Sequence, residues 1–139
     1  MSSPARPRRR RSTAKQRTVL DVLKSQENFR SAQQLYQEIR QHEQLRIGLT
    51  SVYRILRTLA AERVAETQRA EGGEILYRIR TEVGHRHYLL CRECGRAEAF
   101  VPADIEEHAL RLSRQHHYTD VTHYVDIYGV CPLCRTRPS

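Results

Sequence analysis

Four cysteines stand in two matched pairs along the chain. Cys91 and Cys94 form one Cys-x-x-Cys motif, Cys131 and Cys134 form another, and 36 residues separate the two motifs. Each pair can chelate from one turn, and four thiolates complete a tetrahedral Zn²⁺ site with no open position. Redox chemistry is the alternative, because Cys131-Pro-Leu-Cys134 superficially resembles an oxidoreductase motif. Since the two pairs leave no thiol over, the spacing favours a structural zinc site.

Histidines form a second set of possible ligands. His85 and His87 lie two residues apart, so both side chains point to the same face of a strand. From a later predicted strand His123 can reach them, and Glu106 can add a carboxylate from the helix in between. Three imidazoles and one carboxylate suit tetrahedral Zn²⁺; the alternative is a set of unrelated strand histidines. No metal is assigned to His42, His108, His116 or His117.

The elements of the first half predict a winged helix, with a plain three-helix bundle as the alternative. Three amphipathic helices are expected, starting at Ser12 or Thr13, at a capping-box pattern over residues 31–34, and after Gly48 with Thr50 as the cap. A glycine-containing turn before the last helix is typical of a helix-turn-helix. Strand-like runs at 64–68 and 74–79 flank Glu71-Gly-Gly, which predicts the hairpin of a wing.

The charge of this half predicts a nucleic-acid partner. Residues 1–80 hold 17 lysines and arginines against 8 acidic residues, a net charge of +9, whereas residues 81–139 hold 7 against 8. Residues 1–11 form a basic arm that can neutralise phosphates. The outward face of the third helix and the first turn of the first helix offer side chains suited to base edges and phosphates: Ser51, Tyr53, Arg54, Arg57, Lys15 and Arg17.

The second half predicts an α+β dimerisation domain of three strands and one helix. Its expected elements are strands at 87–90, 97–101 and 121–128 and a helix at 102–115. The division follows as a winged-helix domain over 12–80, a hinge over 81–84 and a metal-binding domain over 85–139. Exposed sheet edges in the last of these favour pairing with a second copy.

Several classes of protein are disfavoured. No run approaches the roughly 18 apolar residues of a membrane span, and no apolar run follows the basic N-terminus as in a signal peptide, so we expect a cytoplasmic protein. A zinc hydrolase is disfavoured because the sequence holds no H-E-x-x-H motif and no evident general base. No small-molecule substrate is expected. A DNA-binding adaptor stapled by zinc, without metal sensing, remains an alternative.

The order of these motifs resembles the ferric uptake regulator family. Residues 48–54, Gly-Leu-Thr-Ser-Val-Tyr-Arg, are similar to that family's recognition-helix signature, and Glu71-Gly-Gly to its wing turn. The resemblance implies a homodimeric, metal-dependent repressor that binds a pseudo-palindromic operator. It implies two Zn²⁺ per subunit, a structural ion on the four cysteines and a regulatory ion on His85, His87, Glu106 and His123. It also places Tyr53 on a base-contacting position, and Lys15 and Arg17 in a DNA-contacting segment.

One departure from the family sharpens the expectation. Positions where many members carry a further set of sensory ligands hold Phe29, Glu66, Arg80, Arg86 and Tyr88. Arginine stays protonated and does not ligate a metal, so we expect Glu66 to pair with Arg80 or Arg86 in a fixed ionic hinge. The departure also argues against the peroxide-sensing branch. The zinc uptake regulator branch is favoured, with an iron- or manganese-sensing member as the alternative.

Overall fold

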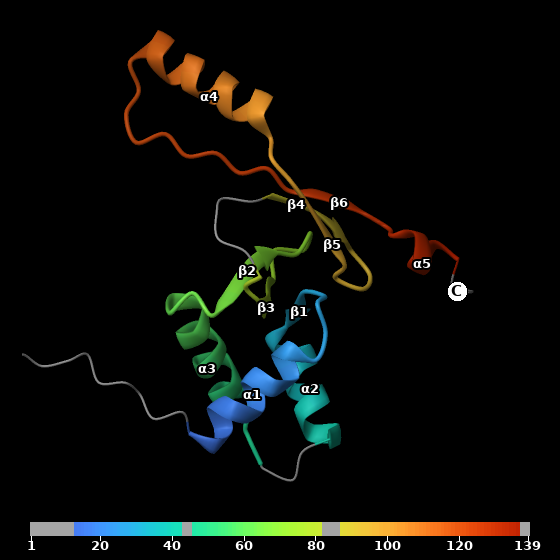
Figure 1. The fold of residues 1–139 in the computed structure, drawn as a ribbon. Helices are drawn as coiled ribbons and strands as arrows, with labels where there is room; N and C mark the ends of the chain where they lie inside the picture. The colour runs from blue at the N-terminus through green and yellow to red at the C-terminus, as the bar shows by residue number, and fades with distance from the viewer. Residues whose placement is uncertain (1–12, 43–45, 82–86, 137–139) are drawn as a thin grey trace, which may run out of the picture.

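The chain contains two small sheets, the first antiparallel and the second mixed, and the first lies against a bundle of helices (Figure 1). The computed structural model describes residues 13–42, 46–81 and 87–136. The expected His85, Arg86 and the basic arm lie outside these residues. None of the helices in the described ranges has the length and apolar character needed to cross a bilayer.

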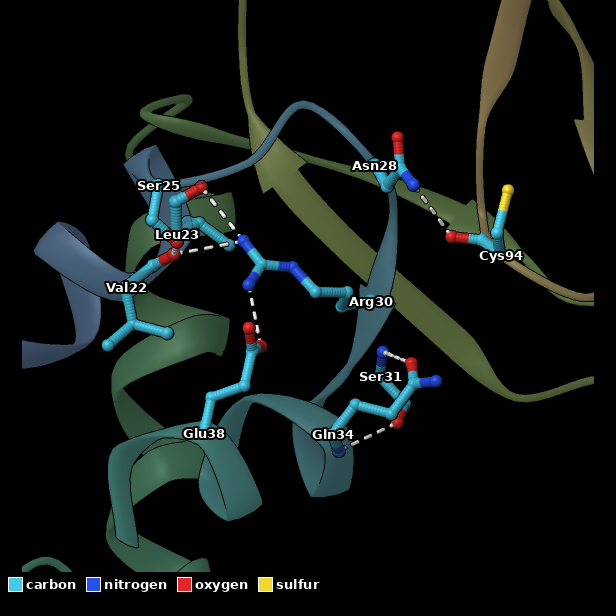
Figure 2. A network of polar contacts seen from close by, with 9 residues as sticks. All are labelled: Val22, Leu23, Ser25, Asn28, Arg30, Ser31, Gln34, Glu38 and Cys94. Atoms are coloured by element: carbon cyan, nitrogen blue, oxygen red, sulfur yellow. Dashed lines mark hydrogen bonds and ion pairs between the residues drawn. The ribbon is translucent and has the colours of Figure 1, made fainter. Parts of the chain in front are cut away.

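Helices α1 (Ala14–Lys24), α2 (Ala32–His42) and α3 (Leu49–Ala61) enclose the main core. Their apolar residues recur at three- and four-residue spacing, so each helix buries one face. Thr13 caps α1 through a capping box with Gln16, as the sequence predicts. The predicted box at Ser31 and Gln34 is also present, with both reciprocal hydrogen bonds formed, at 2.8 and 3.0 Å (Figure 2).

The expected cap of α3 is wrong. The N-cap residue is Gly48, whose carbonyl accepts a hydrogen bond from the Val52 amide at 3.1 Å, and no side chain caps this end. Thr50 therefore lies inside the first turn. Gly48 has an extended backbone and begins the helix two residues earlier than a threonine cap would allow.

The wing is a three-stranded sheet in the order β1-β3-β2. Strands β2 (Ala65–Arg69) and β3 (Ile75–Ile79) form the predicted hairpin, and β1 (Arg30–Ser31) adds a short third strand that the sequence did not indicate. The winged helix is thus confirmed.

The second sheet has the order β5-β4-β6 and carries both metal-ligand clusters. Strands β4 (His87–Cys91) and β5 (Ala97–Phe100) pair antiparallel, whereas β6 (Ile127–Gly129) runs parallel to β4. Helix α4 (Ala103–His116) buries none of its residues and extends away from the sheet in Figure 1. A one-turn helix, α5 (Pro132–Arg135), contains most of the second Cys-x-x-Cys motif and was not expected from the sequence.

The predicted strand at 121–128 is mostly wrong, because its first six residues are not in a strand. The parallel register pairs Leu89 with Ile127, which would put Val125 opposite His87. Residues 121–124 therefore run past the first residue of β4. Alternating side chains alone therefore do not determine where a strand begins.

Candidate metal centres and nucleic-acid interface

The four cysteines meet at one end of the second sheet. Cys91 ends β4, Cys94 follows in the turn, Cys131 is the N-cap residue of α5, and Cys134 lies within this one-turn helix. All four sulfur atoms lie within 4.8 Å of one another, and Cys94 Sγ is 3.7 Å from Cys131 Sγ. A tetrahedron with Zn–S bonds of about 2.3 Å has edges of about 3.8 Å. The cluster therefore has the size and donor chemistry of a structural zinc site.

The protonation of these thiols also suits a cation. Burial opposes ionisation of Cys91, but hydrogen bonds from backbone N–H groups, that of Cys131 foremost, lower the pKa of this thiol to about 6. Burial and the neighbouring cysteines raise the pKa of Cys134 to about 12. Four thiolates cannot crowd together without a compensating charge, and a divalent cation supplies it.

A second cluster joins three separate elements. His87 begins β4, Glu106 lies in the first turn of α4, and His123 lies in the extended stretch before β6. Glu106 Oε1 is 3.8 Å from His87 Nε2 and 3.9 Å from His123 Nε2, and the two rings stack at 5.9 Å. These spacings slightly exceed the roughly 3.4 Å edge of a tetrahedron with 2.0–2.1 Å bonds. A small contraction would bring the three donors onto one ion.

The surroundings of His87 favour coordination through one nitrogen. Its Nδ1 lies 3.4 Å from the Val125 carbonyl, which can only accept a hydrogen bond. A proton on Nδ1 leaves Nε2 with its lone pair directed at Glu106 and His123. The side chain of His87 is 9 % exposed and that of Glu106 35 %, so the site opens toward α4.

The predicted DNA-contacting side chains lie on the surface. Tyr53, Arg54 and Arg57 are exposed on α3, and Ser51 is half-buried at its first turn. Lys15 and Arg17 are exposed in the first turn of α1. Helices α1 and α3 both begin at the end of the bundle furthest from the second sheet (Figure 1), and each carries some of these exposed cationic side chains.

The chain matches the ferric uptake regulator family over residues 8–128. It belongs to this family. A zinc uptake regulation protein of Mycobacterium tuberculosis is 36 % identical over 126 residues, which cover 91 % of this chain and 95 % of that protein.

The fold is similar to the solved structures of two family members. The crystal structure of FurB from M. tuberculosis, described as a zinc uptake regulator, is 35 % identical with a TM-score of 0.50, covering 89 % of this chain and 95 % of that one. The Vibrio cholerae ferric uptake regulator is 27 % identical with a TM-score of 0.62, covering 87 % and 92 %.

Within this family fold, the expected ionic hinge has a different partner. Glu66 pairs with Arg78, at 2.5 Å from Oε1 to Nε, and not with Arg80. Arg86 lies outside the described residues. Tyr88 donates a second hydrogen bond to the same oxygen at 2.9 Å. Burial, followed by this bond to Glu66, raises the pKa of Tyr88 and keeps the phenol a donor.

The sequence interpretation missed two residues that organise the molecule. One is Arg78, whose position opposite Glu66 follows from a hairpin centred on Gly72. The other is Arg30, whose buried guanidinium binds Glu38 and the carbonyls of Val22 and Leu23 (Figure 2). No pattern in the sequence marks Arg30, because an arginine after a predicted loop resembles any surface cation.

Proposed function

We propose that the chain is a zinc-sensing, DNA-binding transcriptional repressor that controls genes of zinc uptake and homeostasis. The observation that carries the proposal is the combination of a basic winged helix with two unlike donor clusters. One cluster is all sulfur, and the other combines nitrogen and oxygen. Thiolates bind zinc firmly, whereas a mixed set that opens toward solvent can exchange its ion.

The cysteine cluster is proposed as the structural site, one of two zinc sites per subunit. It joins the turn after β4 to α5, two segments that hold little apolar core of their own. Structural zinc typically contributes about 10–16 kcal/mol of apparent binding free energy in small zinc peptides, which is also folding free energy. This half of the chain would therefore lose its fold without the ion.

The regulatory site is proposed to consist of His87, Glu106 and His123, completed by His85. Zinc bound there would supply a positive charge that draws the three donors together. Because α4 buries none of its residues, Glu106 is the point at which that helix is tied to the sheet. Closing the site thus fixes α4 against β4 and orders the half of the molecule that dimerises.

A second copy of the chain would cover the apolar surface of this half. Large apolar side chains are exposed on α4 and on the sheet beside it: Ile105, Leu110, Leu112, Leu89 and Ile127. Both β5 and β6 are edge strands. A symmetric dimer would present two α3 helices to successive major-groove half-sites of a pseudo-palindromic operator in the cytoplasm.

An operator-binding titration tests the proposal. DNA sequences that the protein binds are first selected from a random library. The affinity of the protein for them is then measured in the presence of a chelator, and afterwards in buffered Zn²⁺, Fe²⁺ and Mn²⁺ in turn. Zinc should raise the affinity for DNA about tenfold or more, and it should do so at a lower free concentration than Fe²⁺ or Mn²⁺. A stronger response to Fe²⁺ or Mn²⁺ would indicate an iron or manganese sensor, and equal affinity in chelator would indicate an adaptor that does not sense metal.

A further inference from the structure

A tight main-chain contact docks the winged helix on the cysteine turn. The Phe29 amide donates to the Gly95 carbonyl at 2.9 Å. Figure 2 shows the neighbouring bond, which Asn28 Nδ2 donates to the Cys94 carbonyl at 3.0 Å. Gly95 has a φ of +81°, and a Cβ built there would lie 2.0 Å from the Phe29 carbonyl oxygen. Such an approach requires glycine, so the two halves of the chain are fitted to each other at this point.

Beside this contact, the Arg78 guanidinium lies against two aromatic rings, one from each half of the chain. Its guanidinium carbon lies 4.4 Å from the Phe29 centroid and 4.7 Å from that of Tyr88, and the rings meet edge to face at 5.4 Å. Glu66 binds both Arg78 and the Tyr88 hydroxyl. We call these four residues, Phe29, Glu66, Arg78 and Tyr88, the clasp.

The clasp is buried and satisfied from within the protein. Phe29 and Tyr88 are 1 % and 6 % exposed and form one apolar cluster with Leu76 of the wing and Leu90 of the second sheet. The side chains of Arg78 and Glu66 are 12 % and 19 % exposed. Desolvated cation–π contacts and a buried ion pair hold their geometry much better than exposed ones.

Weaker contacts extend the same junction along the wing. Tyr128 donates to the Arg69 carbonyl at 2.7 Å, and Gln68 donates to Asp126 at 3.0 Å. Together with the clasp they join β2 and β3 to β4 and β6. The orientation of the DNA-binding half is therefore fixed by side chains from both sheets.

We propose that Arg78 is a positioning residue for operator recognition. By holding the wing against β4, it fixes the orientation of the winged helix relative to the second sheet. In the dimer, this orientation determines the distance between the two α3 helices. The inference rests on the proposed function, since it concerns how that repressor reads its operator. Arg78 acts through Phe29 and Tyr88, and neither these contacts nor the clasp involves a proposed zinc ligand.

The test compares Arg78→Met with the control Arg96→Met in the zinc-loaded dimer. Methionine keeps most of the length of arginine but has no charge, and Arg96 makes an exposed ion pair with Glu98 within the second sheet. Affinity is measured for the native operator, for operators whose half-sites are moved apart by about two base pairs, and for a single half-site. Zinc content and thermal unfolding are measured alongside.

Arg78→Met should bind two zinc ions and a single half-site as the unsubstituted protein does. It should lose about tenfold in affinity for the native operator and most of its discrimination against the altered spacing, while Arg96→Met changes neither. An unchanged spacing preference in a folded, zinc-loaded Arg78→Met would overturn the proposal. If this variant does not fold, Gly95→Ala, which displaces Phe29 from the other side, is measured in the same way and must give the same loss.

A readout without DNA separates this inference from the proposed function. The Phe29 amide, bonded to Gly95, should exchange its hydrogen much faster in Arg78→Met than in Arg96→Met, because the junction opens more often. Equal exchange in both variants would refute the clasp. If the unsubstituted protein binds no operator with any metal, the proposed function is wrong, and the exchange result still decides whether the clasp holds the junction.

Discussion

Replacing Arg30 by methionine tests whether one buried guanidinium holds the helical bundle together. Arg30 donates to Glu38 at 2.6 Å and to the carbonyls of Val22 and Leu23, at 2.9 and 3.1 Å, near the C-terminal end of α1 (Figure 2). Its side chain is 6 % exposed. It therefore binds two carbonyls at the end of α1, of which that of Val22 also accepts from the Ser25 amide and hydroxyl, and it links α1 to α2.

The size of the effect follows from these contacts. The pair with Glu38 contributes about 1–2 kcal/mol, at the low end for a charged hydrogen bond because the Glu38 side chain is 28 % exposed. Each carbonyl contact contributes about 1 kcal/mol. Against this, Nε of Arg30 is buried without a hydrogen-bond partner among the described residues, and methionine removes that cost. A net loss of about 2–3 kcal/mol is expected, which lowers Tm by about 10–20 °C in a domain of this size.

Urea denaturation of the zinc-loaded protein, followed by far-ultraviolet circular dichroism, measures this loss. Arg40→Met is the control, because Arg40 lies exposed on α2, the helix that carries Glu38, and its guanidinium contacts the face of Tyr36 at 5.7 Å. Glu38→Gln should cost less than Arg30→Met, since an amide oxygen still accepts. If Arg30→Met costs less than about 0.5 kcal/mol, or no more than Arg40→Met, water replaces the guanidinium and the reasoning is wrong.

Three further outcomes are expected. Zinc affinity of the cysteine site should rise with pH, because the Cys134 thiol, with its pKa raised to about 12, must give up a proton on binding; below about pH 6, Cys91 is protonated too and the affinity should fall more steeply. Competition with a chromophoric chelator measures this, and a flat profile would contradict it. Tyr53→Ala should weaken operator binding about tenfold in a mobility-shift assay without changing thermal unfolding, because its ring is 37 % exposed; equal affinity would remove it from the interface. Leu110→Glu should shift the zinc-loaded protein toward monomer in sedimentation experiments, and an unchanged dimer would place the interface elsewhere.

Much of the helical half follows from local sequence rules. Three- and four-residue apolar spacing locates α1, α2 and α3, and the capping boxes at Thr13 and Ser31 form as their side chains predict. The cap of α3 does not, because the backbone at Gly48 can start the helix without a side-chain oxygen. Local patterns thus locate a helix better than they locate its first residue.

Register explains why Glu66 pairs with Arg78, a contact that the sequence interpretation did not anticipate. A hairpin centred on Gly72 pairs Glu66 with Arg78, and Arg80 instead donates its amide to the Val64 carbonyl. Pairing the two strands residue by residue would have found this partner. The contacts of Arg78 with the Phe29 and Tyr88 rings could not be found in this way, because they depend on the relative placement of two sheets.

The candidate metal clusters differ in how they could be predicted. Cys-x-x-Cys spacing brings two ligands together within one turn, so the sulfur cluster needs just one long-range contact. The second cluster takes Glu106 and His123 from separate elements, and the strand expected to carry His123 does not form there. His87, Glu106 and His123 nevertheless lie within reach of one another, and His85 lies outside the described residues. Their role as ligands stays a prediction.

The docking of Asn28 and Phe29 on the cysteine turn also orders events during synthesis. The contact spans 66 residues along the chain, and the turn that receives it is completed by cysteines made later still. The helical bundle can form its core as soon as the wing has been translated. We expect it to rest on its partner half only after Cys131 and Cys134 have emerged and the proposed structural zinc has bound. In a nascent chain the winged helix can therefore fold before its orientation for binding two half-sites is established.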